Sequence, residues 1–181
     1  MNIYFQHQQE TFILRFLNEN DSELLYSYFQ NLSEQTKKRY APHSFEKSVV
    51  EQICKNISTD NILRFIVENS EKHIIAYFLF KKGIFDYEHK RIWEKGFDLP
   101  LETSLDFAPS IADKYQGSGL GKEIFRLCLD QLKSLKCSHL VLWGGVQKSN
   151  EKAVKYYQKL GFQVVNEFEH QGQNYDMILF L

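Results

Sequence analysis

A run of alternating glycines between a strand-like and a helix-like segment is the feature that most constrains this chain. The sequence GSGLG occupies positions 117–121. Residues 103–111 before it are strand-like, and the apolar residues after it recur at helical spacing to about Leu135. Backbone N–H groups at a helix N-terminus lack intrahelical partners and attract anions, and glycine leaves them uncovered while permitting unusual φ angles. The stretch therefore predicts a phosphate-binding loop between a strand and a helix.

Two familiar phosphate loops do not fit this spacing. A Walker loop needs a glycine five residues before its Gly-Lys pair and a serine or threonine after it, but Gln116 and Glu123 occupy those positions. A dinucleotide-binding loop needs GxGxxG near the first strand of a parallel unit, whereas this stretch lies late in the chain and has Lys122 in place of the third glycine. A different kind of phosphate loop is expected.

Two motifs resemble those of the GCN5-related N-acetyltransferases (GNATs), the superfamily that transfers acyl groups from acyl-coenzyme A. The segment from Gln116 to Gly121 resembles their Q/R-x-x-G-x-G/A motif. Downstream, NEKAVKYYQKLGF at 150–162 resembles their N-x-x-A-x-x-x-Y-x-x-x-G-F segment. The two motifs stand in the family's order and at its usual separation, and the clear resemblance covers roughly 104–162.

The resemblance implies an α+β fold with a central, mostly antiparallel twisted sheet and helices on both faces. It also implies a V-shaped splay between the family's strands 4 and 5, which correspond here to 108–111 and 140–146. We expect a single acyl-CoA N-acyltransferase (GNAT) domain over 1–181, with an insertion or lid at about 83–100. Periodicity and turn residues predict strands at 12–18, 63–67, 73–80, 139–143, 162–165 and 175–181, helices at 20–40, 44–57, 120–135 and 151–160, and a break at 41–44.

The family binds coenzyme A along the glycine loop and the strand before it. By resemblance, the pyrophosphate is expected on the main-chain amides of the loop and the pantetheine arm beside 108–111. Asn150 matches a family asparagine that contacts the pantetheine or bridges the splay, and plain helix capping explains it equally well. The expected cofactor-binding residues are Pro109, Ser110, Ile111, Gln116, Gly117, Ser118, Gly119, Leu120, Gly121, Lys122 and Asn150.

Tyr157 falls on the family's tyrosine near the coenzyme sulfur, so the resemblance implies that it protonates the departing thiolate. Such general-acid help is typically worth about 10²- to 10⁴-fold in rate. Simple packing is the alternative for this residue. Tyr156 points about 100° away around the helix and is expected in the core. Because Cys128 lies on the apolar face of its helix, we expect direct transfer without a covalent enzyme intermediate.

Asp106 is the candidate base, because it lies at a register where some relatives carry a catalytic glutamate. An acceptor amine must be uncharged to attack, and since aspartate is shorter than glutamate we expect a bridging water. Glu102 has the same side-chain parity and is the alternative base. The alternative without a catalytic role is that Asp106 and Glu102 are solvated acids on the strand face. Backbone amides of the strand are the expected oxyanion site.

Composition excludes several classes of function. A formal net charge of −1 and a sequence pI of about 6.6 provide no overall field for nucleic acid or an anionic membrane. The three cysteines are far apart and in no CxxC spacing, which argues against a metal site or a disulfide framework and for a reducing compartment. No segment approaches the ~20 apolar residues of a membrane span, and the N-terminus does not read as a leader. We therefore expect a cytoplasmic protein with no metal.

The expected partners are acetyl-CoA as cosubstrate and a primary amine as acceptor, with a homodimer left open. Tyr40, His43, Trp93 and Phe97 are candidates for lining the acceptor pocket, with core packing as the alternative. A non-catalytic acyl-CoA-binding sensor or interaction module on the same fold is the second functional hypothesis. The sequence does not identify the acceptor amine.

Overall fold

A computed structural model describes residues 1–40 and 42–181 of the chain. Ala41, which belongs to the predicted break at 41–44, lies outside the described residues. The chain divides into two compact units, each built from two stretches of sequence. The first unit comprises Met1–Leu79 with Pro109–Gln131, and the second comprises Phe80–Ala108 with Leu132–Leu181.

The strands of the first unit begin with a hairpin at the N-terminus. They are β1 (Asn2–His7), β2 (Glu10–Phe16), β3 (Ile62–Glu68) and β4 (Ile74–Lys82). β1 pairs antiparallel with β2, and β2 pairs antiparallel with β3. The prediction of a single strand at 12–18 identified only β2. β1 was missed because its residues alternate only between exposed and half-buried positions, so that none of them marks a buried face.

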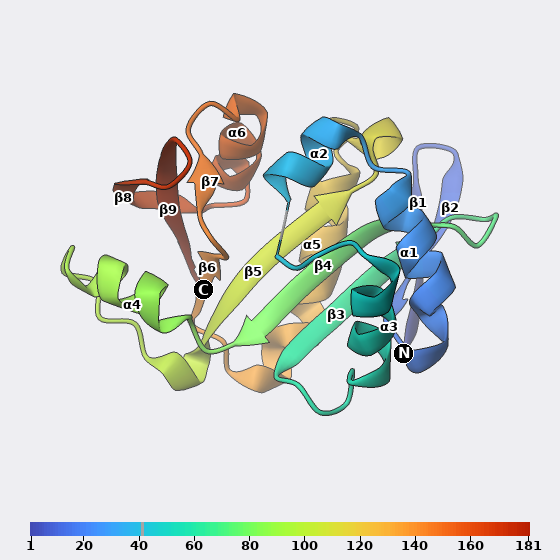
Figure 1. The fold of residues 1–181 in the computed structure, drawn as a ribbon, viewed down its shortest axis with the longest axis horizontal. Coiled ribbons are helices and arrows are strands. Elements are labelled where there is room, and N and C mark those ends of the chain that lie inside the picture. The colour runs from blue at the N-terminus through green and yellow to red at the C-terminus, as the bar shows by residue number, and fades with distance from the viewer. Residues whose placement is uncertain (41) are drawn as a thin grey trace. The chain divides into compact units, whose positions relative to one another are not determined.

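Helices cover both faces of these strands. They are η1 (Glu19–Asp21), α1 (Ser22–Gln30), α2 (Glu34–Arg39), α3 (Lys47–Lys55), η3 (Asp113–Tyr115) and α5 (Leu120–Leu132). Figure 1 shows α1 and α3 in front of the strands of the first unit and α5 behind them. The helix predicted over 20–40 is divided, because Ser33 caps a new helix by accepting the N–H of Thr36 at 3.2 Å.

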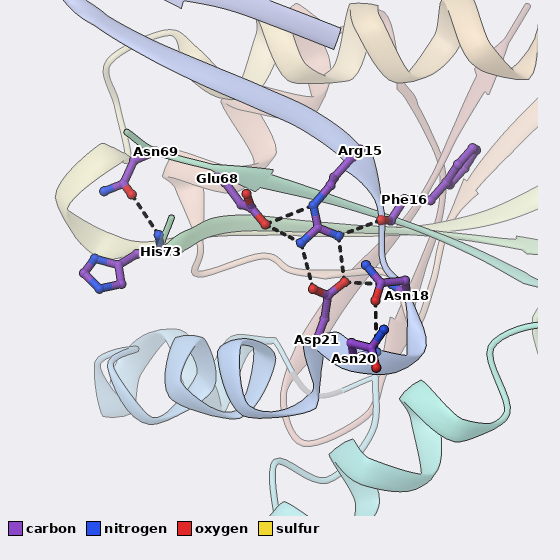
Figure 2. A network of polar contacts seen from close by, with 8 residues as sticks. All are labelled: Arg15, Phe16, Asn18, Asn20, Asp21, Glu68, Asn69 and His73. Carbon is purple, nitrogen blue, oxygen red and sulfur yellow. Dashed lines mark hydrogen bonds and ion pairs between the residues drawn. The ribbon is translucent and has the colours of Figure 1, made fainter. Parts of the chain in front are cut away.

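An arginine fork ties three elements of the first unit together (Figure 2). Arg15 on β2 donates two hydrogen bonds of 2.7 Å to Asp21 of η1, and its Nε donates to Glu68 of β3 at 2.9 Å. The side chains are only 15%, 5% and 10% exposed, respectively. Hydrogen bonding to Asp21, together with Glu68, raises the pKa of Arg15. The fork thus neutralises two nearly buried carboxylates where β2 leads into the first helix.

The second unit contains the remaining strands and the helices between them. They are α4 (Asp86–Trp93), η2 (Leu101–Thr103), β5 (Ser104–Ile111), η4 (Lys133–Leu135), β6 (His139–Leu142), β7 (Val146–Gln147), α6 (Glu151–Lys159), β8 (Gln163–Glu169) and β9 (Gln173–Phe180). β5 and β6 pair in parallel, whereas β6, β7 and β8 each pair antiparallel with β9. The hairpin predicted from 162–165 and 175–181 is confirmed.

The strands follow the order β1-β2-β3-β4-β5-β6-β9-β7, with β8 paired to β9. β4 and β5 each contribute residues to both units. The α+β fold with a mostly antiparallel sheet is therefore confirmed.

The ladder between β5 and β6 ends where the splay was predicted. Its last pair is Phe107 with Leu142, after which Trp143 donates its N–H to the carbonyl of Phe107 at 3.0 Å. Gly144 and Gly145 then adopt φ values of 73° and 71°. A Cβ on Gly145 would lie 2.6 Å from a backbone oxygen, so only glycine fits there. The strand that follows pairs with β9.

Residues 83–100 were expected to be a poorly periodic connection, but they contain helix α4. Ile92 is fully buried in a cluster with Ile84, Leu99, Val141 and Ile178. Arg91 donates hydrogen bonds of 2.7 and 2.6 Å to Asp176 on β9. The segment therefore belongs to the core of the second unit, and its role as an insertion or lid remains a prediction.

Candidate functional site

The glycine loop has the backbone conformation that its sequence predicts. Gly117 and Gly119 adopt φ values of 81° and 90°, in the left-handed region that favours glycine. The Ser118 hydroxyl donates to the carbonyl of Tyr115 at 2.8 Å and accepts the N–H of Leu120 at 3.3 Å. α5 begins at Leu120 and runs for 13 residues. A helix of several turns therefore begins directly after the loop, and the N-terminus of such a helix binds anions.

Side chains from two elements anchor the start of this loop in the first unit. Gln116 donates to the carbonyl of Ile111 at 3.0 Å and to the hydroxyl of Thr36 at 3.4 Å. Asp113 accepts the N–H and the hydroxyl of Ser33 at 2.9 and 2.7 Å, and the hydroxyl of Thr36 at 2.6 Å. Desolvation opposes ionisation of Asp113, but these hydrogen bonds outweigh it and lower its pKa. These hydrogen bonds hold the start of α2 against the residues that lead into the loop.

The strand end predicted to accompany pantetheine offers little besides its backbone. The Ser110 side chain is buried, and its hydroxyl lies 2.7 Å from that of Tyr28. Burial raises the pKa of Tyr28, so this phenol keeps its proton. Pro109 and Ile111 are half-buried. Since proline has no N–H, backbone hydrogen bonds from this end must use the amides of Ser110 and Ile111 or carbonyl oxygens.

Asp106 is fully buried in the second unit, so the reading as a solvated acid is wrong for this residue. Its Oδ2 accepts the N–H of Phe85 at 3.1 Å and lies 3.6 Å from Nζ of Lys81. Burial raises the pKa of Asp106, whereas the charge of Lys81 opposes that shift. Glu102, the alternative base, is exposed at the start of η2.

A second buried carboxyl, Glu88 of α4, pairs with Asp106. Glu88 is fully buried and accepts the N–H of Gly144 with one oxygen, while its Oε2 and the Oδ1 of Asp106 are buried without a hydrogen-bond partner among the described residues. Burial and the charge of Asp106 both raise the pKa of Glu88. Two adjacent buried carboxylates repel each other, and a shared proton removes the repulsion. The pair therefore holds a proton, and the nearby ammonium of Lys81 favours Asp106 as its ionised member.

Glu88 was missed in the sequence because it lies in a segment without clear periodicity. The pairing of a helix residue with a strand residue 18 positions later leaves no local pattern. Lys81 was missed for the same reason.

α6 carries the two remaining predicted residues, Asn150 and Tyr157. Asn150 caps the helix by accepting the N–H of Ala153 at 3.4 Å, so the capping interpretation is confirmed and the contact with pantetheine remains a prediction. The Tyr157 ring packs edge-on against Phe162 at 5.7 Å. Burial raises the pKa of Tyr157, so its hydroxyl carries a proton at neutral pH, as a general acid must.

Other predictions around these residues have mixed outcomes. Tyr156 is half-buried, so its placement in the core is wrong. Cys128 is fully buried, and burial raises its thiol pKa well above the ordinary value, as expected of a cysteine with no nucleophilic role.

Among residues 1–40 and 42–181, no group of three or more histidine, cysteine, aspartate or glutamate side chains is placed to hold a metal ion. No helix in this described part is long and apolar enough to cross a membrane.

The four candidates for an acceptor pocket belong to different units. Tyr40 is buried and His43 half-buried in the first unit, whereas Trp93 is exposed and Phe97 half-buried in the second. The His43 ring lies edge-on to three aromatic rings at centroid distances of 5.3, 5.8 and 6.0 Å. Burial lowers the pKa of His43, so its ring is neutral at neutral pH. His43 therefore sits in an aromatic cluster with Phe29, Phe45 and Tyr77, within reach of the charge of Arg64.

The predicted site residues thus fall into two groups. The glycine loop and the end of β5 lie in the first unit, and Asp106, Asn150 and Tyr157 lie in the second.

Comparison with known sequences connects these features. The model of the Acetyltransferase (GNAT) family matches residues 23–162, which is well over half of the chain. A spermine/spermidine N(1)-acetyltransferase of Bacillus subtilis (strain 168) is 30% identical over 98 residues, which are 54% of this chain and 55% of that protein. The chain thus spans about half the length of the curated relatives it matches.

Solved structures share the fold at low sequence identity. A ribosomal-protein-S5-alanine acetyltransferase from Vibrio fischeri has a TM-score of 0.74 at 16% identity, covering 99% of this chain and 96% of that one. A spermidine N-acetyltransferase from Vibrio cholerae, in complex with CoA and spermine, has a TM-score of 0.67 at 22% identity, covering 93% and 95%.

Proposed function

Because the chain belongs to the acetyltransferase (GNAT) family, we propose that it transfers an acetyl group from acetyl-CoA to a primary amine. The family match carries this proposal, since it spans both the glycine loop and α6. The loop geometry supports it, because Gly117 and Gly119 have positive φ immediately before α5. Uncovered N–H groups and the helix macrodipole favour a diphosphate at such a place.

Acetyl-CoA is the proposed cosubstrate, and residues 116–122 are proposed to bind its pyrophosphate through main-chain amides. The hydrogen bonds from Gln116 to Ile111 and Thr36 support this role, because they hold the start of the loop without using its later amides. The backbone of 109–111 and the side chain of Asn150 are proposed to contact the pantetheine arm. A cytoplasmic location, a homodimer and the absence of nucleic-acid or membrane partners remain predictions.

The proposed reaction is a direct transfer. The acceptor ammonium loses a proton, its nitrogen attacks the thioester carbonyl, a C–N bond forms, and the C–S bond breaks. Tyr157 donates its proton to the departing thiolate, and the second proton that the nitrogen loses as the amide forms restores the Tyr157 phenol. Asp106 takes up the ammonium proton through a water, and its raised pKa suits it to that role near neutral pH. Glu88 keeps the proton of the acid pair, which leaves Asp106 ionised and able to act as the base.

A polyamine is the acceptor that we propose. The relative from Bacillus subtilis carries the name spermine/spermidine N(1)-acetyltransferase and matches about half of the chain.

Release of free coenzyme A thiol from acetyl-CoA tests the proposal. We expect turnover with spermine and spermidine above that with an alanine-terminated peptide. Gly119→Val should abolish it, because its side chain would cover the anion-binding backbone and a Cβ there already contacts His7 at 3.8 Å. Gly96→Val is the matched control, since Gly96 also has positive φ but no atom lies within 4 Å of its Cβ position.

Wild-type protein that acetyl-CoA stabilises, but that releases no thiol with any amine, would refute the enzyme and support a coenzyme-binding module. Equal loss of turnover in both glycine variants would refute the assignment of the loop.

A further inference from the structure

A histidine on the first strand reaches the glycine loop across the sequence. His7 is the last residue of β1. Its Nε2 lies 3.0 Å from the carbonyl oxygen of Ser118, and its Nδ1 lies 2.9 Å from Oε2 of Glu123 in the first turn of α5. The two side chains of this ion pair are 18% and 29% exposed. All three residues belong to the first unit.

The hydrogen-bond inventory fixes the number of protons in this arrangement. A backbone carbonyl can only accept, and an ionised carboxylate can only accept. Both ring nitrogens of His7 must therefore donate, which requires the doubly protonated imidazolium. If Glu123 carried the proton instead and donated it to Nδ1, the pair would hold the same total number of protons. In either case it holds one proton more than a neutral imidazole beside a carboxylate.

We propose that His7 is a positioning residue for the glycine loop, and that its imidazolium fastens the loop for coenzyme binding. This inference rests on the proposed function. The bond to Ser118 fixes the peptide between Gly117 and Gly119, both of which occupy the left-handed region. Glycine has the largest backbone freedom of any residue, so a restraint at this place removes the most disorder. It also turns the Ser118 carbonyl toward His7, where it does not face an anion.

The charges around His7 act in the same direction. Glu123 shares a pocket with Gly119, Lys122 and Arg126. Protonated His7 neutralises Glu123, which leaves the two cations to favour an anion beside the loop. On the other side, Glu10 pairs with His7 in the β1–β2 register and accepts the hydroxyl of Tyr115 at 3.0 Å. If the bond between His7 and Glu123 is lost, the Glu123 carboxylate becomes uncompensated beside the loop. Coenzyme affinity should therefore fall when the His7 side chain is removed.

Three variants test the two hydrogen bonds of His7 to Ser118 and Glu123, here called the clasp, in the coenzyme-free protein. His7→Ala removes it. Glu123→Gln preserves it with a neutral ring, because the Gln amide can donate to Nδ1. His73→Ala is the matched control, since His73 pairs with Glu71 in the same unit at 3.4 Å but is 67% exposed and lies in the turn before β4. Hydrogen exchange of the amides at 118–121 should accelerate about two- to tenfold in His7→Ala and stay unchanged in His73→Ala.

Calorimetry with coenzyme A measures the effect on affinity. The dissociation constant should rise about two- to tenfold in His7→Ala and stay unchanged in His73→Ala and in Glu123→Gln, which keeps both hydrogen bonds. Equal exchange at 118–121 in wild type and His7→Ala, or an equal dissociation constant in these two proteins, would overturn the proposal. Protected loop amides in a wild-type protein without coenzyme affinity would refute the proposed function and support the clasp itself.

Discussion

Removing the guanidinium of Arg15 should destabilise the protein strongly, because it leaves two nearly buried carboxylates without a partner. Arg15→Met keeps most of the hydrocarbon stem and removes the hydrogen bonds to Asp21 and Glu68. Those side chains are only 5% and 10% exposed, so water cannot replace the guanidinium fully. Breaking a buried pair by removing one partner costs about 3–5 kcal/mol. This is a large part of the ~5–15 kcal/mol that stabilises a typical domain.

Urea unfolding followed by circular dichroism measures this loss. Lys155→Met is the control, since Lys155 pairs with Glu151 at 3.3 Å but both side chains are more than two-thirds exposed, and it should leave the free energy of unfolding nearly unchanged. Adding Asp21→Asn and Glu68→Gln to Arg15→Met should recover part of the loss, because the buried charges disappear. A loss below about 1 kcal/mol for Arg15→Met, or a further loss in the triple variant, would show that the fork does not act by neutralising buried charge.

Three further predictions concern the second unit. Tyr157→Phe should lower the rate of thiol release at saturating substrate by about 10²-fold or more without changing the melting temperature, and an unchanged rate would exclude its role as general acid. Burial raises the pKa of Glu88 in the folded protein above its value in the unfolded chain. The stabilisation by protonated Glu88 is therefore present at low pH and is lost as pH rises through the folded pKa. In urea unfolding, the free energy of unfolding should decline more steeply from about pH 5 to about pH 8 in wild type than in Glu88→Gln. Gly145→Ala should lower the free energy of unfolding by about 2 kcal/mol or more, because its Cβ would lie 2.6 Å from the carbonyl oxygen of Tyr175. If Gly96→Ala lost as much in the same unfolding experiment, the effect would reflect only backbone strain.

Local signals in the sequence predicted the glycine loop and the helices beside it. Gly117 and Gly119 have the positive φ that alternating glycines permit. Gly161 ends α6 at φ 98°, as a left-handed cap does. Each of these features depends on residues within one or two turns of each other, so composition and spacing contain most of the information.

The features that the sequence did not reveal depend on contacts between distant positions. His7 and Glu123 are 116 positions apart, and Arg91 and Asp176 are 85 apart. α4 has no clean apolar stripe, because charged residues on it point into the core as well as outward: Glu88 is fully buried, whereas Lys90 is exposed. A buried carboxyl is tolerated there because the N–H of Gly144 donates to it and because its raised pKa favours the neutral form, and no local pattern shows either.

Helix α4 connects the acid pair to the C-terminal hairpin. Glu88 and Arg91 stand three positions apart and so share one face of the helix. Glu88 accepts the N–H of Gly144. The Arg91 guanidinium stacks 3.7 Å from the centre of the Phe168 ring and donates to Asp176. Asp176 also accepts a hydrogen bond of 2.9 Å from Asn166. The charge of Arg91 opposes the rise in the pKa of Glu88, and Asp176 fixes the position of that charge. The C-terminal hairpin thus holds in place one of the charges that set the acidity of the buried pair.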